Sequence, residues 1–149
     1  MIEPERLIQV GVRAVDEIEK RLLVQRPVHV YDMRQIDELR MRTVMEQVLA
    51  QAARDGSHLH VSLDVDFLDP AIAPGVPTTV AGGPTYREAQ LCMEMIHDSG
   101  LLGSLDIAEL NPAFDNGNTT ARLVVELVTS LLGAQILARP HDSSSSWSL

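Results

Sequence analysis

Short apolar runs alternate with longer amphipathic stretches along this chain, and turn residues separate them. Apolar runs of this length predict strands, and apolar residues that recur every three or four positions predict helices. The predicted strands cover residues 8–12, 28–31, 58–64 and 102–109, and the predicted helices lie at about 16–23, in the segment before Gly56, at 85–97 and at 120–137. Strands that alternate with helices favour a parallel sheet covered on both faces. The pattern therefore predicts an α/β fold of three layers, α/β/α, around a mainly parallel sheet.

Local signals mark where several of these elements begin and end. Thr85 and Glu88 form a capping box that opens the helix after the longest loop, and Gly100 follows its end. Pro140 ends the last helix. A chain of 149 residues fits one domain, which we place at residues 1–140. Residues 141–149 contain four consecutive serines and predict a disordered tail.

The longest loop follows the predicted strand at residues 58–64. Between Pro70 and Pro84 it holds four prolines and three glycines, which predicts a shaped loop without helix or strand. A loop of this length inside a compact domain usually serves function. We therefore expect this loop to take part in the activity of the protein.

Charge and cysteine content narrow the classes of function. The 12 basic and 21 acidic residues give a formal net charge of -9. Such a surface repels phosphate groups, so we expect neither nucleic acid nor an anionic membrane as partner, whereas a cationic substrate or a metal suits it. No signal peptide and no apolar run of membrane-spanning length are evident, so the cytoplasm is the expected location. The single cysteine, Cys92, excludes an internal disulfide, and its apolar neighbours predict a buried structural thiol.

Two carboxylates stand at the end of the strand at residues 58–64. Because side chains alternate along a strand, Asp64 and Asp66 point to the same side and repel each other unless a cation lies between them. A hard divalent cation such as Mn²⁺ or Mg²⁺ prefers oxygen ligands of this kind. The alternative is a solvated turn in which an Asp side chain caps the backbone. By alternation, His60 shares a face with Asp64.

Further acids follow the ends of other predicted strands. Asp16 and Glu19 follow the first strand, and Glu109 ends the last. In a parallel sheet the carboxyl ends of neighbouring strands meet at one edge, where ligands bind. Each acid alone is equally typical of a helix start or a solvated surface. Together they predict an acidic rim at one edge of the sheet.

Three segments resemble signatures of a known family. Residues 62–83, with the pattern S-x-D-x-D-x-x-D-P-x-x-x-P-G followed by seven residues and Gly83, resemble the last signature of the ureohydrolases, which include arginase, agmatinase and formiminoglutamase. Residues 105–112, L-D-I-A-E-L-N-P, resemble the family pattern L-D-[IVM]-x-E-[VL]-N-P. Residues 11–19, G-V-R-A-V-D-E-I-E, resemble the arginase segment G-[IL]-R-x-V-D-x-x-E, and this match favours arginase over agmatinase.

The resemblance implies an activity, a cofactor and a set of residue roles. In arginases two Mn²⁺ ions activate a hydroxide that attacks the guanidinium carbon of L-arginine, and the products are L-ornithine and urea. Arginases assemble as trimers or hexamers, so a homo-oligomer is expected. By the resemblance, Asp64 bridges both metals, Asp66 binds one of them, Asp16 and Glu19 hold the α-ammonium group, Glu109 orients the guanidinium, and Thr78 lines the substrate pocket.

Two further arginase signatures have no match in this sequence. They are a G-G-D-H-type segment and D-x-H-x-D, which supply the other metal ligands, and a histidine thought to shuttle protons is also absent. The resemblance therefore covers the C-terminal half of an arginase, and no catalytic residue is assigned here.

We expect the chain alone to have little or no activity. Because a partial sheet exposes an unpaired edge and apolar surface, we also expect it to self-associate or to be only marginally stable. The alternatives are a non-catalytic domain that binds a metal or arginine, a half that complements a separate N-terminal part, and an unrelated carboxylate-metal hydrolase.

Overall fold

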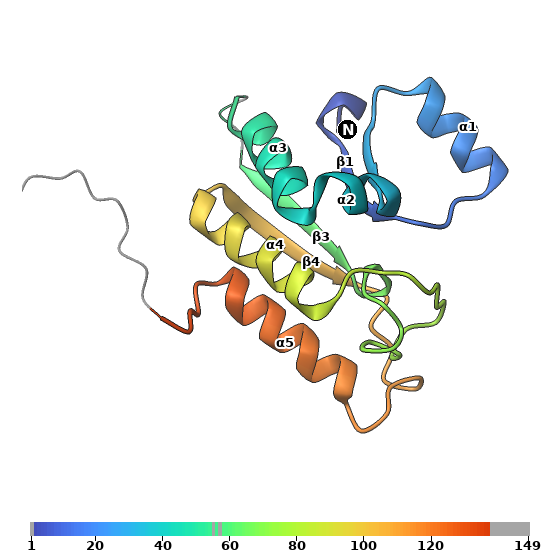
Figure 1. Ribbon diagram of the computed structural model, residues 1–149, viewed down its shortest axis with the longest axis vertical. Helices are drawn as coiled ribbons and strands as arrows, with labels where there is room; N and C mark the ends of the chain where they lie inside the picture. Colours follow the sequence, from blue (N-terminus) through green and yellow to red (C-terminus); the bar gives the residue numbers. More distant parts are fainter. Residues whose placement is uncertain (1, 55, 57, 138–149) are drawn as a thin grey trace, which may run out of the picture.

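A computed structural model describes residues 2–54, 56 and 58–137 of the chain. Helices and strands alternate as the hydrophobic pattern predicts (Figure 1). The elements are a 3₁₀ turn η1 (Pro4–Arg6), β1 (Ile8–Val12), α1 (Glu17–Gln25), β2 (His29–Asp32), α2 (Met33–Leu39), α3 (Met41–Arg54), β3 (Leu59–Asp64), a 3₁₀ turn η2 (Val65–Phe67), α4 (Tyr86–Ser99), β4 (Leu102–Ala108) and α5 (Thr119–Leu131). The tail predicted at residues 141–149 lies outside the described residues.

The strands form two parallel pairs. β1 pairs with β2, and β3 pairs with β4 in a register that places Asp64 opposite Ala108. Within the described residues no ladder of hydrogen bonds joins the two pairs, so the single four-stranded sheet expected from the alternation is divided in two. The parallel polarity is as predicted, and it directs the carboxyl ends of β3 and β4 to the same edge.

The hydrophobic core lies between β3–β4 and three helices. α3 packs against α4 and α4 against α5, and the three lie side by side over one face of the strand pair (Figure 1). Val44, Ala89 and Leu127, one from each helix, are fully buried. Cys92 of α4 is buried in the same core, as expected. α2 covers β1 and β2.

The opposite face of β3–β4 differs from the prediction, because no described helix covers it. Four polar side chains on this face are exposed, namely His60, Ser62, Ser104 and Asp106. The helices that follow β3 and β4, α4 and α5, both pack on the other side (Figure 1). Within this chain, helices therefore cover one face of the pair and leave a polar face open.

Two helix boundaries depart from the sequence pattern for local reasons. α5 ends at Leu131 and not near Leu137, because Gly133 adopts a positive φ of 104° and Leu132 and Leu137 are exposed. The long amphipathic segment before Gly56 is divided into α2 and α3 at Arg40, whose φ is 70°. The helix opened by Thr85 and closed by Gly100 is α4, with its capping box in place.

Among the described residues, none of the helices combines the length and the apolar character needed to cross a membrane.

Candidate metal and substrate site

The carboxyl end of β3 continues into a tight turn that carries the two predicted metal ligands. Asp64 is the last residue of β3, and Asp66 lies in η2 directly after it. The Asp66 backbone N–H donates to Asp64 Oδ1 at 3.1 Å. Val65, between them, is fully buried against Val76 and Val124. Because Val65 anchors the turn in the core, the two carboxylates are held at its surface.

This part of the molecule concentrates negative charge. The pKa of Asp66 is raised, first by desolvation and then by the carboxylate of Asp64, with a smaller contribution from Glu109; the Arg13 guanidinium acts in the opposite direction. The register of β3 and β4 agrees with this, since Asp64 lies opposite Ala108 and Glu109 directly follows Ala108. Like charges that gather at a partly buried edge favour a bound cation.

The donor set suits a hard divalent cation only in part. Carboxylate oxygens are the ligands that Mn²⁺ and Mg²⁺ prefer. No group of three or more His, Cys, Asp or Glu residues in the described part of the chain could hold a metal ion. Asp64 also caps the turn with Oδ1, as the alternative interpretation from the sequence proposes. Two carboxylates would leave most coordination positions to water or to other protein groups.

Glu109 directly follows β4 and has a strained backbone. Its φ is 63°, in the left-handed region that a residue with a side chain rarely adopts. The segment after it is tied to the long loop, since the Asn111 N–H donates to the Gly75 carbonyl oxygen at 2.9 Å. Strain of this kind costs about 1–3 kcal/mol and is typical of functional sites. Here it turns the chain at the edge where Asp64 lies.

The long loop is held in shape by one carboxylate. Asp69 Oδ2 accepts hydrogen bonds from the N–H groups of Gly82 at 2.8 Å and Gly83 at 3.2 Å, and Oδ1 accepts one from Ala71 at 2.9 Å. Gly83 lies so close to the start of the loop that a Cβ there would be 2.7 Å from the Asp69 nitrogen. The loop thus has a defined backbone path without helix or strand, as predicted. Thr78, the predicted pocket residue, is exposed on it.

The remaining predicted substrate residues lie on a separate arm. Asp16 is the N-cap of α1, and its Oδ1 accepts from the N–H groups of Ile18 at 2.7 Å and Glu19 at 2.8 Å. Its other carboxylate oxygen takes no part in these capping bonds. Both Asp16 and Glu19 are exposed, and Figure 1 shows α1 apart from the β3–β4 pair.

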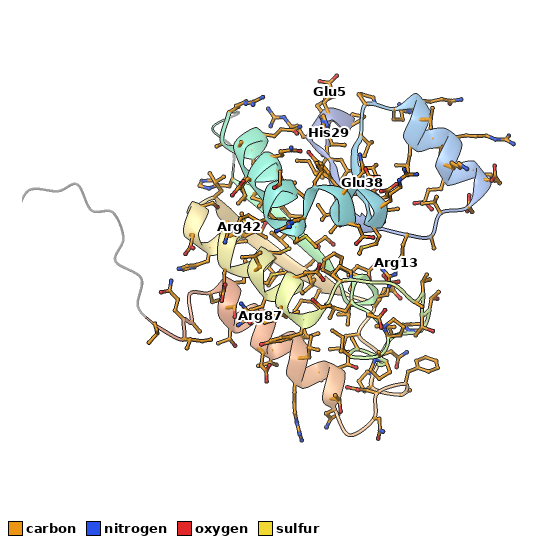
Figure 2. The ribbon with its side chains drawn as sticks, in the orientation of Figure 1. Glu5, Arg13, His29, Glu38, Arg42 and Arg87 are labelled. Atoms are coloured by element: carbon orange, nitrogen blue, oxygen red, sulfur yellow. The ribbon has the colours of Figure 1, made fainter. Side chains whose placement is uncertain are left out.

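Arg13 connects this arm to the turn that carries Asp64 and Asp66. No role for Arg13 was predicted from the sequence. Its guanidinium group donates to carbonyl oxygens of Asp66, Phe67, Leu68 and Val80. Figure 2 shows Arg13 where the segment leaving β1 meets the loops that follow β3. These partners are 53 to 67 residues away in the sequence, so no local pattern indicates the contact.

A polar network on the open face of β3–β4 was also not predicted. Asp106 accepts from the Ser62 hydroxyl at 2.6 Å and lies 3.0 Å from His60 Nε2, while His60 Nδ1 lies 2.7 Å from the Ser104 hydroxyl. The hydrogen bond from Ser62 and the proximity of His60 lower the pKa of Asp106. His60 thus shares a face with Asp64, as alternation indicates, and its two ring nitrogens contact Ser104 and Asp106 of β4.

Comparison with known proteins identifies the family. A sequence model described as "Arginase family" matches residues 1–133. The chain belongs to the arginase family. An arginase of Brucella melitensis is 50% identical over 142 residues, which are 95% of this chain and 46% of that protein. The arginase of Bacillus subtilis is 46% identical over 91% of this chain, and again 46% of the relative is matched. The chain therefore spans about half the length of the curated arginases it matches.

Solved arginase structures confirm the α/β fold. The arginase of Bacillus caldovelox superposes with a TM-score of 0.89 at 41% identity, over 91% of this chain and 46% of that one. An Entamoeba histolytica arginase solved in complex with L-ornithine has a TM-score of 0.83 at 26% identity, over 89% of this chain and 45% of that one. The resemblance inferred from the three sequence signatures is thus confirmed. The part of the arginase fold present here is an incomplete α/β unit, with one face of β3–β4 open.

Proposed function

We propose that these residues supply part of a manganese-dependent site that hydrolyses L-arginine to L-ornithine and urea, and that the chain alone is inactive. The observation that carries the proposal is the register of β3 and β4, which places Asp64 opposite Ala108, so that Asp64, Asp66 and Glu109 stand at the carboxyl ends of two paired parallel strands. Guanidinium is a poor electrophile, so its hydrolysis needs a metal-generated hydroxide and carboxylates that hold the cation.

In this proposal each acid has a defined task. Asp64 and Asp66 hold metal, and the hydroxide that Mn²⁺ supplies when bound is the nucleophile. Glu109 accepts hydrogen bonds from the planar guanidinium group, whose paired N–H donors match a carboxylate. Asp16 and Glu19 bind the α-ammonium group at the other end of the substrate, and Thr78 lines the pocket between.

In the proposed site, the remaining metal ligands come from polypeptide beyond the described residues. The described residues offer no larger ligand group, and the matched arginases are about twice as long. The open polar face of β3–β4 and the division of the strands into two pairs are consistent with a fold completed by further strands and helices. That polypeptide can be a further segment or a second chain, and assembly into homo-oligomers is part of the same proposal.

A non-catalytic role is the second candidate, because two carboxylates and a substrate arm can bind metal or arginine without turnover. Addition of a recombinant N-terminal half of the Brucella melitensis arginase separates the two candidates. Urea release on mixing supports a complementing half-site, whereas binding of Mn²⁺ without urea release supports the non-catalytic role.

Metal binding itself is tested by Mn²⁺ titration followed by electron paramagnetic resonance. We expect weak binding, because two carboxylates leave most coordination positions of the ion to water. The double variant Asp64→Asn with Asp66→Asn is expected to lose it. The matched control is Asp37→Asn, on the exposed side of α2. Equal binding by the double variant would contradict the assignment of Asp64 and Asp66 as metal ligands.

A further inference from the structure

Arg13 makes a concentrated set of contacts with the main chain. Nη2 donates to the carbonyl oxygens of Asp66 at 2.5 Å and Leu68 at 3.3 Å, and Nη1 donates to that of Phe67 at 3.1 Å. Nε and Nη2 both donate to the Val80 carbonyl oxygen, at 2.9 and 2.8 Å. One partly buried side chain thus binds the turn that carries Asp66 and the loop that carries Thr78.

Only an arginine can make this set of bonds. Its guanidinium group presents five N–H donors in a rigid plane, and it stays charged at every working pH. The Arg13 hydrogen bonds to residues 66–68 and 80 all end on backbone carbonyl oxygens, so they determine the path of the main chain. The positive charge remains close enough to Asp66 and Asp69 to favour their ionised forms.

Asp69 complements Arg13 with the opposite charge. Arg13 gathers carbonyl groups, whereas Asp69 gathers the N–H groups of Ala71, Gly82 and Gly83. The long loop is therefore closed by a cation on one side and an anion on the other. Both groups act at the start of the loop and again at residues 80–83, so loss of either frees one set of backbone partners.

The same junction also determines where β1 lies. The Gly11 position, two residues before Arg13, would place a Cβ 2.5 Å from the Phe67 ring, so only glycine lets this ring pack against β1. Arg13 is in turn three residues before Asp16. The junction therefore places the segment that leads to Asp16 beside the turn that carries Asp66.

We propose that Arg13 is a positioning residue that holds the metal-binding turn, the Thr78 loop and the arm bearing Asp16 and Glu19 in one arrangement. This inference rests on the proposed function, because it assigns Arg13 a task in that site. L-Arginine has a limited reach between its α-ammonium and guanidinium groups, so both ends are bound only if arm and turn stay within that reach. A misplacement of about 1 Å can cost roughly 100-fold in rate.

The test compares Arg13→Gln and Arg13→Lys with the control Arg21→Gln, an exposed arginine on α1. Amide hydrogen exchange by NMR reports on Gly82 and Gly83 in the loop and on β3–β4 amides in the core. Mn²⁺ affinity is measured by electron paramagnetic resonance on the same samples.

For Arg13→Gln we expect exchange at Gly82 and Gly83 to rise about tenfold or more, core exchange to stay unchanged, and Mn²⁺ affinity to fall about tenfold, as for groups that orient metal ligands. Arg13→Lys is expected to restore part of both, since it keeps the charge and loses the planar set of donors. Arg21→Gln is expected to match the unsubstituted chain.

Unchanged loop exchange and Mn²⁺ affinity in Arg13→Gln would overturn the inference. Equal loss of protection in the loop and the core would also overturn it, because Arg13 would then serve only general stability. If Arg13→Gln does not fold, the same comparison is made on Arg13→Lys. Absence of Mn²⁺ binding in the unsubstituted chain contradicts the proposed function and the metal part of this inference, while the exchange comparison still decides whether Arg13 orders the loop.

Discussion

The two regions that carry the site residues are held in different ways. The β3–β4 pair with α3, α4 and α5 has a continuous core, in which Val44 and Leu127 are 0% exposed. α1 buries no residue, and its Ile18 and Val24 are 72% and 83% exposed. The turn that carries Asp64 and Asp66 is therefore held by buried residues, whereas the segment with Asp16, Glu19 and α1 is not.

The proposed metal ligands and the proposed ligands of the α-ammonium group thus lie in regions that differ in packing. The proposed metal ligands Asp64 and Asp66 need a fixed geometry, which buried Val65 between them provides. The arm has few buried contacts in this chain, so its position depends on the junction at Arg13 and on whatever further polypeptide covers α1. Regions with little buried apolar surface open at low free-energy cost.

The largest expected effect is the difference in unfolding free energy between a substitution in the core and one on α1. Leu127→Ala removes a fully buried side chain and should lower the free energy of unfolding by about 2–5 kcal/mol. Leu22→Ala, on α1 where the leucine is 49% exposed, should cost less than about 1 kcal/mol. Urea denaturation of both variants measures this, and equal losses would show that α1 belongs to the same packed unit as α5.

A smaller effect is expected for Gly83→Ala in the long loop. The added Cβ would lie 2.7 Å from backbone atoms of residues 67–69, which must shift. Such overpacking costs about 1–3 kcal/mol. Gly117→Ala is the control, since no atom lies within 4 Å of its Cβ and only its positive φ of 61° opposes the change. A thermal melt in which Gly83→Ala loses no more than the control would contradict the close packing of the loop.

Acid is expected to open the loop before the core. Hydrogen bonds from the N–H groups of Ala71 and Gly82 lower the pKa of Asp69, with a weaker contribution from Gly83. A group whose pKa is lowered in the folded state stabilises it above the ordinary carboxyl range, near pH 4, and this contribution is lost as pH falls through the lowered value. The protection factor of the Gly82 amide, corrected for the intrinsic pH dependence of exchange, should therefore fall on acidification. In Asp69→Asn the same pH step should have no such effect on this amide.

The smallest effect is expected at the start of the arm. Asp16→Ala removes the N-cap of α1, a loss of about 1 kcal/mol for the helix. Because α1 is not packed in the core, exchange at Ile18 and Glu19 should increase while the midpoint of global unfolding stays the same. Asp16→Asn, which can still cap, should preserve the helix. A lower midpoint of global unfolding for Asp16→Ala would show that α1 unfolds together with the core, contrary to this expectation.

What could be predicted from the sequence was mostly local. Thr85 and Gly100 mark the ends of α4 because capping uses neighbouring residues, and Asp64 and Asp66 share one turn. The predicted end of the last helix, near Leu137, was wrong. Apolar residues continue at helical spacing past Leu131, but the positive φ of Gly133 is not compatible with a continuous helix.

Contacts between distant parts of the chain could not be predicted in the same way. The bonds of Arg13 join residues more than 50 positions apart, and no periodicity reports them. The expectation of one sheet with two covered faces assumed that neighbours in sequence are neighbours in space. The α/β fold with parallel strands is confirmed, but in the described part of the chain β1–β2 and β3–β4 are not joined by a ladder.

We propose that this chain supplies part of an arginase site and is inactive alone. The most direct test is urea release from the purified 149-residue chain with L-arginine and excess Mn²⁺, with folding verified by circular dichroism. The account predicts no urea above background from a folded sample. Sustained, Mn²⁺-dependent release of urea would contradict it, because the missing ligands would then have to be supplied within or between copies of this chain.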